Sequence, residues 1–197
     1  MNKLAAVLMA GGRSKRMGIS KALLDYKGTP LWLFQMEKLV QLRPDQIFFS
    51  VPPGMEFPSG SWTFVHDRSP DIGPLGGLEA ALRLTRENFL VTLAVDMPAM
   101  TAEFLSFLLG KAGPAGVVPH FEGFYHGAAA VYPVTILPLV EQILAGNDRS
   151  FQHLIREALQ SGIMKAEEME QATSGLFENW NSPEDLERAS NPLLYRG

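Results

Sequence analysis

The sequence contains no cysteine in its 197 residues. A disulfide framework, a cysteine nucleophile and a zinc–thiolate site are therefore excluded. No apolar run approaches the roughly 18 residues that a transmembrane helix needs. The first residues also lack the long apolar core and small-residue cleavage site of a secretory signal. These absences predict a soluble, cytoplasmic protein with no membrane partner.

Positive charge is scarce as well. The chain has 17 Lys and Arg residues against 21 Asp and Glu residues, which gives a formal net charge of -4. A general nucleic-acid-binding protein would normally be basic, so we expect no nucleic-acid partner. Hydrophobic residues, in contrast, make up 46% of the chain, and a chain of this length buries roughly 70% of its unfolded surface. We expect one domain over residues 1–190, followed by a loose tail over residues 191–197.

Short apolar runs alternate along the chain with helical patterns. The apolar runs predict strands over residues 4–9, 46–51, 62–66, 89–95 and 128–132. The helical patterns predict helices over residues 31–42, 75–86, 101–112, 135–144 and 150–160, and Ser182 and Pro183 are typical of a further helix start. The first helix should carry Trp32, Met36, Leu39 and Val40 on one face. This alternation predicts an α/β fold: a single three-layer α/β/α domain with a Rossmann-like, mostly parallel sheet.

The stretch after the first strand is LMAGGRSKRMGISKALL, residues 8–24. Its two glycines, Gly11 and Gly12, allow the backbone to approach a ligand closely, and successive N–H groups in a turn form an anion-binding concavity. Arg13, Lys15, Arg16 and Lys21 add positive charge, which favours phosphate as the ligand. The pattern is neither a P-loop nor a three-glycine dinucleotide fingerprint. A glycine turn beside a solvated basic loop is the alternative interpretation.

Three further stretches precede or follow predicted elements. Asp96 comes directly after the most apolar run, at the strand end where ligands bind in such sheets, and a carboxylate there can hold Mg²⁺ that is shared with phosphates. A cap or turn role is the alternative. Residues 67–82 form a Gly/Pro-rich stretch that could line one side of a ligand-binding site or could be a loop that binds no ligand. Asn179 and Asn181 either bind a ligand or satisfy backbone groups in a turn.

The four histidines show no metal-ligand spacing, and we expect them to be structural or exposed. His126 is the one that we also weigh as a residue lining the crevice at the strand ends.

Four motifs together resemble the molybdenum cofactor guanylyltransferases, a family within the nucleotidyltransferase superfamily. The motifs are LMAGGRSKRMGISKALL, GPLGGLEAAL, VDMP and NWNSPEDL, in this order between Leu8 and Leu186. The resemblance implies an enzyme that transfers GMP from GTP to molybdopterin and releases pyrophosphate, with Mg²⁺ as cofactor. The resemblance does not decide whether proteins that deliver the molybdenum cofactor are also partners of this chain. Cytidylyl transfer to the same pterin, nucleotidyl transfer to a sugar phosphate, and a non-catalytic nucleotide or pterin carrier are the alternatives.

The resemblance also implies roles for individual residues. Lys21 matches the phosphate-contacting lysine, Arg16 matches a basic residue ahead of Met-Gly, and Asp96 matches the magnesium ligand. These three are the expected catalytic residues. The residues that match the nucleotide-binding loop are Met9, Ala10, Gly11 and Gly12.

The remaining matches concern the base and the second substrate. Asp67 matches a nucleotide-contacting aspartate, and Asn179 and Asn181 match an Asn-x-Asn pair near the second substrate and the metal, with Asn181 as a metal ligand. Ser50 stands where the family often has an asparagine that contacts guanine. His126 and Gly127 replace the proline-centred segment expected near the pterin.

Overall fold

Strand β1 (Leu4–Met9) lies in the middle of an eight-stranded sheet whose order is β10-β7-β9-β6-β1-β4-β5, with β8 paired to β7. The computed structural model describes residues 3–10, 21–66, 73–180 and 185. The other strands of the sheet are β4 (Gln46–Ser50), β5 (Thr63–Val65), β6 (Phe89–Ala94), β7 (Gly116–Phe121), β8 (Phe124–Tyr125), β9 (Val131–Pro133) and β10 (Met164–Glu168). A separate two-stranded ribbon joins β2 (Asp25–Tyr26) to β3 (Thr29–Pro30).

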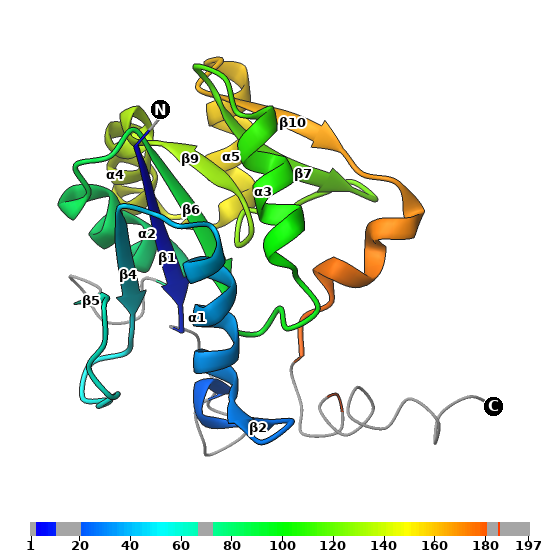
Figure 1. Cartoon of the computed structure of the whole chain (residues 1–197). Coiled ribbons are helices and arrows are strands. Elements are labelled where there is room, and N and C mark those ends of the chain that lie inside the picture. The colour runs from blue at the N-terminus through cyan, green and yellow to red at the C-terminus, as the bar shows by residue number, and fades with distance from the viewer. Residues whose placement is uncertain (1–2, 11–20, 67–72, 181–184, 186–197) are drawn as a thin grey trace.

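Helices cover both faces of this sheet (Figure 1). They are α1 (Leu31–Gln41), α2 (Pro74–Leu84), α3 (Ala102–Lys111), α4 (Leu137–Ala145) and α5 (Phe151–Gln160), with short 3-10 segments η1 (Lys21–Leu23), η2 (Val134–Ile136) and η3 (Gln171–Phe177). Side chains alternate between the two faces of a strand, so a strand buried on both faces must be apolar throughout. In β1, Ala6 and Leu8 pack with α1 and α3, whereas Val7 and Met9 pack with α2, α4 and α5. The predicted three-layer α/β/α architecture is therefore confirmed.

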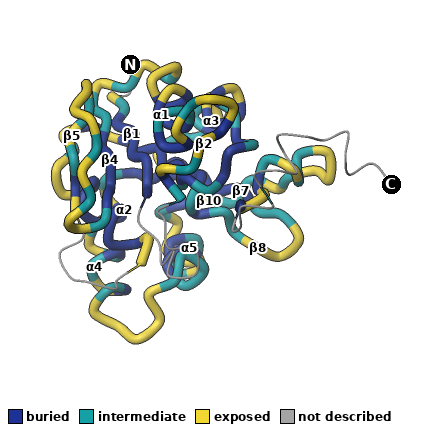
Figure 2. The backbone as a smooth tube through the Cα atoms, turned by 90° about the horizontal axis from the view of Figure 1, so that it is seen from below, coloured by how far each residue is buried: buried dark blue, intermediate teal, exposed yellow. Residues whose placement is uncertain are grey.

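Strand direction divides the sheet. Strands β5, β4, β1 and β6 are all parallel, and β10 is parallel to β7. Strand β9 runs antiparallel to both β6 and β7, and β8 forms a hairpin with β7. The turn of that hairpin consists of Glu122 and Gly123, both with positive φ, and it is exposed (Figure 2). The sheet is thus mostly parallel, as predicted, with one reversed strand inside it.

Most predicted elements are present, with ends that differ from the prediction by at most three residues. The strand expected over residues 128–132 is assigned to β9, but the carbonyls of Ala128 and Ala130 still accept hydrogen bonds from β6 amides. The helix expected over residues 135–144 begins as the 3-10 segment η2 and continues as α4. Strands β7, β8 and β10 were not predicted. Residues 182–183 and the tail over residues 191–197 lie outside the described residues.

One helix face differs from the prediction. Val40 was expected on one face with Trp32, Met36 and Leu39, but it is 47% exposed whereas those three are buried. The inner face of α1 instead carries Gln35 and Lys38, both buried, beside Trp32 and Leu39. These polar groups are tolerated because they are hydrogen-bonded to the strand layer, as described below. Within the described ranges, no helix has the length and apolar character needed to cross a membrane.

Candidate functional site

The carboxyl ends of the parallel strands bring together three of the predicted nucleotide-binding residues, Met9, Ala10 and Ser50. Met9 at the end of β1 pairs with Ser50 on one side and with Ala94 on the other. The backbone continues this pairing beyond the strand, since the Ala10 amide donates to the Ser50 carbonyl at 2.8 Å and the Val95 amide donates to the Met9 carbonyl at 3.0 Å. The start of the glycine-containing loop is therefore fixed between β4 and β6.

Two residues that are 75 positions apart meet at this edge. Lys21 Nζ lies 3.1 Å from Asp96 Oδ2. The side chains are only partly buried, with 17% and 26% of their surfaces exposed. An ammonium group and a carboxylate placed together offer one charge for phosphate oxygens and the other for a divalent cation. Both residues were predicted to carry the chemistry, and the structure brings them into contact.

The Asn-Trp-Asn stretch reaches the same place. The Trp180 amide donates to the Asp96 carbonyl at 2.8 Å. The Trp180 ring is buried and packs edge-on against Tyr26, with 5.2 Å between ring centroids. This packing anchors residues 179–180 beside the Asp96 turn, so Asn179 lies close to Asp96.

Two side chains of α1 also hydrogen-bond to the backbone of the Asp96 turn, and the sequence analysis did not predict these contacts. The Gln35 carboxamide Nε2 donates to the carbonyls of Ala94 and Met97 at 3.0 and 2.9 Å. Lys38 Nζ donates to Gln35 Oε1 and to the Pro98 carbonyl, both at 2.6 Å. Burial lowers the pKa of Lys38 to about 8. The only sequence signal was a Gln and a Lys three residues apart on the inner face of an apolar helix.

Several predicted site residues lie outside the described residues: Gly11, Gly12, Arg16, Asp67 and Asn181. Among the residues that the structure describes, no group of three or more His, Asp or Glu side chains could hold a metal alone. Mg²⁺ that is shared with phosphates commonly uses one or two carboxylates and completes its shell with substrate oxygens and water. The Asp96 carboxylate at the strand exit fits that kind of donor set.

Three of the four histidines have structural partners. His66 Nδ1 lies 3.1 Å from the Val51 carbonyl, His120 Nδ1 lies 2.7 Å from Glu168, and His153 Nδ1 lies 3.0 Å from the Asp148 carbonyl. His126 instead lines a cavity of about 370 Å³ together with Met97 and Asn179. The expectation that His126 lines the crevice is thus confirmed.

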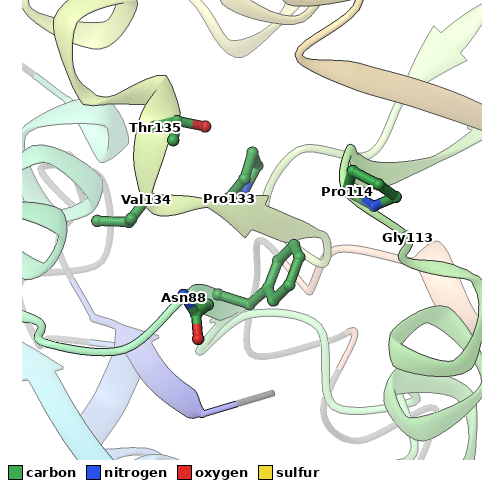
Figure 3. Close-up of a pocket in the computed structure, with 7 residues that line it drawn as sticks. Asn88, Gly113, Pro114, Pro133, Val134 and Thr135 are labelled. Carbon is green, nitrogen blue, oxygen red and sulfur yellow. The ribbon is translucent and has the colours of Figure 1, made fainter. Parts of the chain in front are cut away.

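A larger cavity, of about 490 Å³, lies at the amino end of β6 (Figure 3). Its lining consists of Asn88, Phe89, Gly113, Pro114, Pro133, Val134 and Thr135. None of these described lining residues is ionisable, and the cavity lies at the opposite end of the strands from Asp96. It therefore lacks the charged groups that phosphate chemistry requires.

A mostly parallel α/β sheet with a Lys–Asp pair where its strands end is the arrangement that the sequence led us to expect of a nucleotidyltransferase. The particular family follows from comparison: a model of the "MobA-like NTP transferase domain" matches residues 6–162, and the chain belongs to that family.

Known proteins extend this similarity over nearly the whole chain. The molybdenum cofactor guanylyltransferase of Pseudomonas putida is 34% identical over 187 residues, covering 92% of this chain and 94% of that protein. A probable molybdenum cofactor guanylyltransferase of Opitutus terrae is 30% identical over 190 residues, covering 94% of each. The crystal structure of molybdopterin-guanine dinucleotide biosynthesis protein A from Archaeoglobus fulgidus is 21% identical and superposes with a TM-score of 0.73, over 95% of this chain and 97% of that one. At that identity the structural likeness concerns the fold.

Proposed function

We propose that this chain transfers GMP from GTP to molybdopterin and releases pyrophosphate. The observation that carries the proposal is the Lys21–Asp96 contact of 3.1 Å at the end of β6. It occurs in a chain whose relatives, at 30% and 34% identity, are called molybdenum cofactor guanylyltransferases. The NWNSPEDL stretch adds to this support because Trp180 bonds to Asp96 from the far end of the sequence.

The reaction requires no protein nucleophile. A terminal phosphate oxygen of the acceptor attacks the α-phosphorus in line, the bond from that phosphorus to the bridging oxygen breaks, and pyrophosphate leaves with the electron pair. The attacking phosphate is already an anion, so no general base is needed. Catalysis then consists of positioning the two phosphates and neutralising their charge. Lys21, with Arg16, supplies positive charge to the leaving pyrophosphate.

We assign Asp96 and Asn181 as the residues that hold Mg²⁺. When bound, the cation neutralises phosphate oxygens during the transfer. The protein's contribution is to fix the Asp96 turn, which Gln35, Lys38 and Trp180 all contact. The nucleotide is bound by the backbone of residues 9–12, with Ser50 near the base and Asp67 as a further contact.

The direct test is to incubate purified protein with Mg²⁺, each of the four nucleoside triphosphates and either molybdopterin or a sugar phosphate, and to measure pyrophosphate release. We expect GTP to be used fastest. Faster release with CTP than with GTP would show that the chain transfers CMP and not GMP. Release with a sugar phosphate but not with molybdopterin would reassign the acceptor. No release under any condition would leave a non-catalytic nucleotide or pterin carrier.

We further infer that the reaction takes place in the cytoplasm and that the product is passed to proteins that deliver the molybdenum cofactor. The support for the first inference is the sequence composition, and for the second it is the chemistry of the product, which is itself a cofactor.

A further inference from the structure

The turn over residues 94–98, which contains Asp96, is held by its carbonyl groups. Gln35 Nε2 donates to the carbonyls of residues 94, 97 and, at a longer distance, 95, with lengths of 3.0, 2.9 and 3.5 Å. Lys38 Nζ donates to the carbonyl of residue 98 at 2.6 Å, and the Trp180 amide donates to the Asp96 carbonyl at 2.8 Å. Each carbonyl in this turn therefore accepts a hydrogen bond, and all of them except that of Asp96 accept one from a side chain of α1.

Gln35 can bond to the turn in one orientation only. It is fully buried, and its Oε1 lies 2.6 Å from Lys38 Nζ. An ammonium group has donors and no acceptor, so it must face the carboxamide oxygen, and the carboxamide NH₂ then faces the carbonyls of the turn. Lys38 therefore fixes the direction of the Gln35 side chain, and the two residues act as one unit.

Lys38 is also connected to Trp180 through a row of aromatic rings. Its Nζ lies 4.2 Å from the ring centroid of Phe34. Phe34 packs edge-on against Tyr26 with 4.8 Å between centroids, and Tyr26 packs edge-on against Trp180 with 5.2 Å between centroids. The residue whose amide bonds to the Asp96 carbonyl is thus supported by the same lysine that bonds to the far end of the turn.

The carboxyl end of β6 differs in this respect from the ends of β1 and β4. At the ends of β1 and β4, main-chain amides donate to the carbonyls of Met9 and Ser50, at 3.0 and 2.8 Å. At the end of β6, two buried side chains add donors on both sides of Asp96. A glutamine and a lysine lower the stability of a buried helix face unless their polar groups are bonded. Their presence in α1 is therefore explained by the turn that they hold, which is the strand exit where the proposed metal ligand stands.

A carboxylate binds a cation more tightly when its backbone is already fixed. In a turn that is free to move, cation binding has to order the backbone as well as the side chain, and that loss of conformational freedom opposes binding. Hydrogen bonds that orient a metal ligand have large effects, since removing one commonly weakens metal affinity ~10–100-fold. Gln35 and Lys38 hold the backbone of Asp96 in this way.

We propose that Gln35 and Lys38 are positioning residues that set the affinity of the Asp96 carboxylate for its divalent cation. This inference rests on the proposed function, in which Asp96 holds Mg²⁺. Neither side chain is assigned a contact with the cation or with a substrate, since both donate to backbone carbonyls of the turn. Their effect passes through the backbone of residues 94–98.

The experiment compares GTP binding with and without the cation. Calorimetric titration of GTP in Mg²⁺ and in EDTA gives two affinities for each protein, and their ratio is the gain in affinity that Mg²⁺ provides. The test variants are Gln35→Met, which keeps the length of the side chain and removes its donors, Lys38→Met, and the double variant. Gln41→Met is the control, because it makes the same change at an exposed position of the same helix. Asp96→Asn is the reference for loss of the metal ligand, and thermal melting reports folding.

We expect the gain from Mg²⁺ to be smaller by ~10-fold or more in Gln35→Met and in Lys38→Met than in wild type. The double variant should lose no more than the larger single loss, because the two side chains act as one unit. The affinity for GTP in EDTA should be the same in these proteins, and Gln41→Met should keep the full gain. A lower melting temperature with an undiminished gain in Gln35→Met and Lys38→Met would mean that the pair supports only the fold, and would overturn the proposal.

The two proposals fail differently. An undiminished gain in Asp96→Asn would remove the metal role of Asp96 from the proposed function, and this inference with it. Loss of the gain in Asp96→Asn, together with a full gain in Gln35→Met and Lys38→Met, would overturn the positioning role alone.

A measurement on the wild-type protein covers the case in which the variants do not fold. The carboxamide protons of Gln35 should exchange with solvent at least ~10-fold more slowly than those of Gln41, since they are buried and bonded to the turn. Proton exchange measured by NMR on ¹⁵N-labelled protein reports both side chains. Equal exchange rates would show that Gln35 does not hold the turn and would refute the positioning role.

Discussion

The two halves of the sheet differ in the direction of their strands and in the side chains that lie beside them. Strands β1, β4, β5 and β6 are parallel, and their carboxyl ends carry a charged pair, Lys21 and Asp96. Strands β8 and β9 each pair with β7 in the antiparallel sense, and the cavity on that side is lined by neutral groups around His126. Parallel strands have their carboxyl ends at the same edge of the sheet, and the backbone groups there are available to bind a nucleotide. Beside the reversed strand and the hairpin lies a pocket of about 370 Å³ that is partly open to solvent.

Asp96 lies on the boundary between these halves, since β6 pairs with β1 on one side and with β9 on the other. Substitutions in the parallel half should therefore change nucleotide handling and leave pterin binding intact. The following variants test that separation.

Asp96→Asn should have the largest effect. It keeps the size of the side chain but removes the charge proposed to hold Mg²⁺, and the loss of one strong electrostatic contact costs ~3–4 kcal/mol of transition-state stabilisation. Turnover should fall by a factor of ~10²–10³, with an unchanged melting temperature. The measurement is pyrophosphate release at saturating Mg²⁺ alongside a thermal melt. Near-normal turnover would remove Asp96 from the catalytic residues.

Lys21→Ala should weaken GTP binding more than GMP binding, because its charge is proposed to meet the β- and γ-phosphates that GMP lacks. A hydrogen bond to a charged group contributes ~1.5–3 kcal/mol, or about a 10- to 100-fold change in affinity. Calorimetric titration of both nucleotides measures the difference. Lys111→Ala is the control, because Lys111 pairs with Glu167 on the other half of the sheet. Equal losses for GTP and GMP would place Lys21 away from those phosphates.

Lys38→Met should destabilise the fold by ~1–3 kcal/mol, since Gln35 Oε1 and the Pro98 carbonyl lose a buried donor. The pKa of Lys38 is about 8 in the folded chain, against 10.5 for an ordinary lysine such as that of the unfolded chain. Between these values the unfolded chain binds a proton that the folded chain has released, so this group makes the unfolding free energy rise with pH. Its contribution is complete above the higher pKa and is lost as the pH falls through the lower one.

The Lys38→Met variant lacks that increment, so its stability deficit relative to wild type should widen across this pH window. Urea unfolding of both proteins at pH 7.5 and at pH 10 measures it. The same pH slope in both proteins would show that Lys38 does not titrate there. Pterin binding should be unaffected at either pH.

Ser50→Ala should have the smallest effect. A single hydrogen bond contributes ~0.5–1.5 kcal/mol, so the preference for GTP over CTP should fall by tenfold at most. The measurement is kcat/KM for each nucleotide, with a similar maximal rate expected. An unchanged ratio would remove Ser50 from the base pocket, and guanine recognition would then rest with the backbone of residues 9–12.

The same division explains what the sequence could predict. Strands β1 and β6 are buried on both faces and therefore read as continuous apolar runs. Strand β10 was missed because its sequence, MKAEE, reads as a solvated loop. Its acidic residues have partners in the fold, Lys111 for Glu167 and His120 for Glu168. Strand β7 was obscured by Pro119, a residue that normally argues against a central strand.

For the site, residue chemistry was sufficient where a charged side chain follows an apolar strand, as Asp96 does. It was insufficient for Gln35 and Lys38, because their role depends on the carbonyl groups of a turn some 60 residues later. Periodicity ranks residues by hydrophobicity, and it therefore placed Val40, and neither Gln35 nor Lys38, on one face with Trp32, Met36 and Leu39. Only the tertiary arrangement reveals that the buried face of α1 needs hydrogen-bond donors.

The central position of β1 has a consequence for synthesis on the ribosome. Both of its partners come later in the chain, β4 at residues 46–50 and β6 at residues 89–94. At roughly 5–20 residues per second, about 4–17 s separate the completion of β1 from that of β6. During that interval the nascent apolar segment LAAVLM has at most one of its two neighbours. We expect it to be a binding site for chaperones that recognise short hydrophobic segments on translating ribosomes.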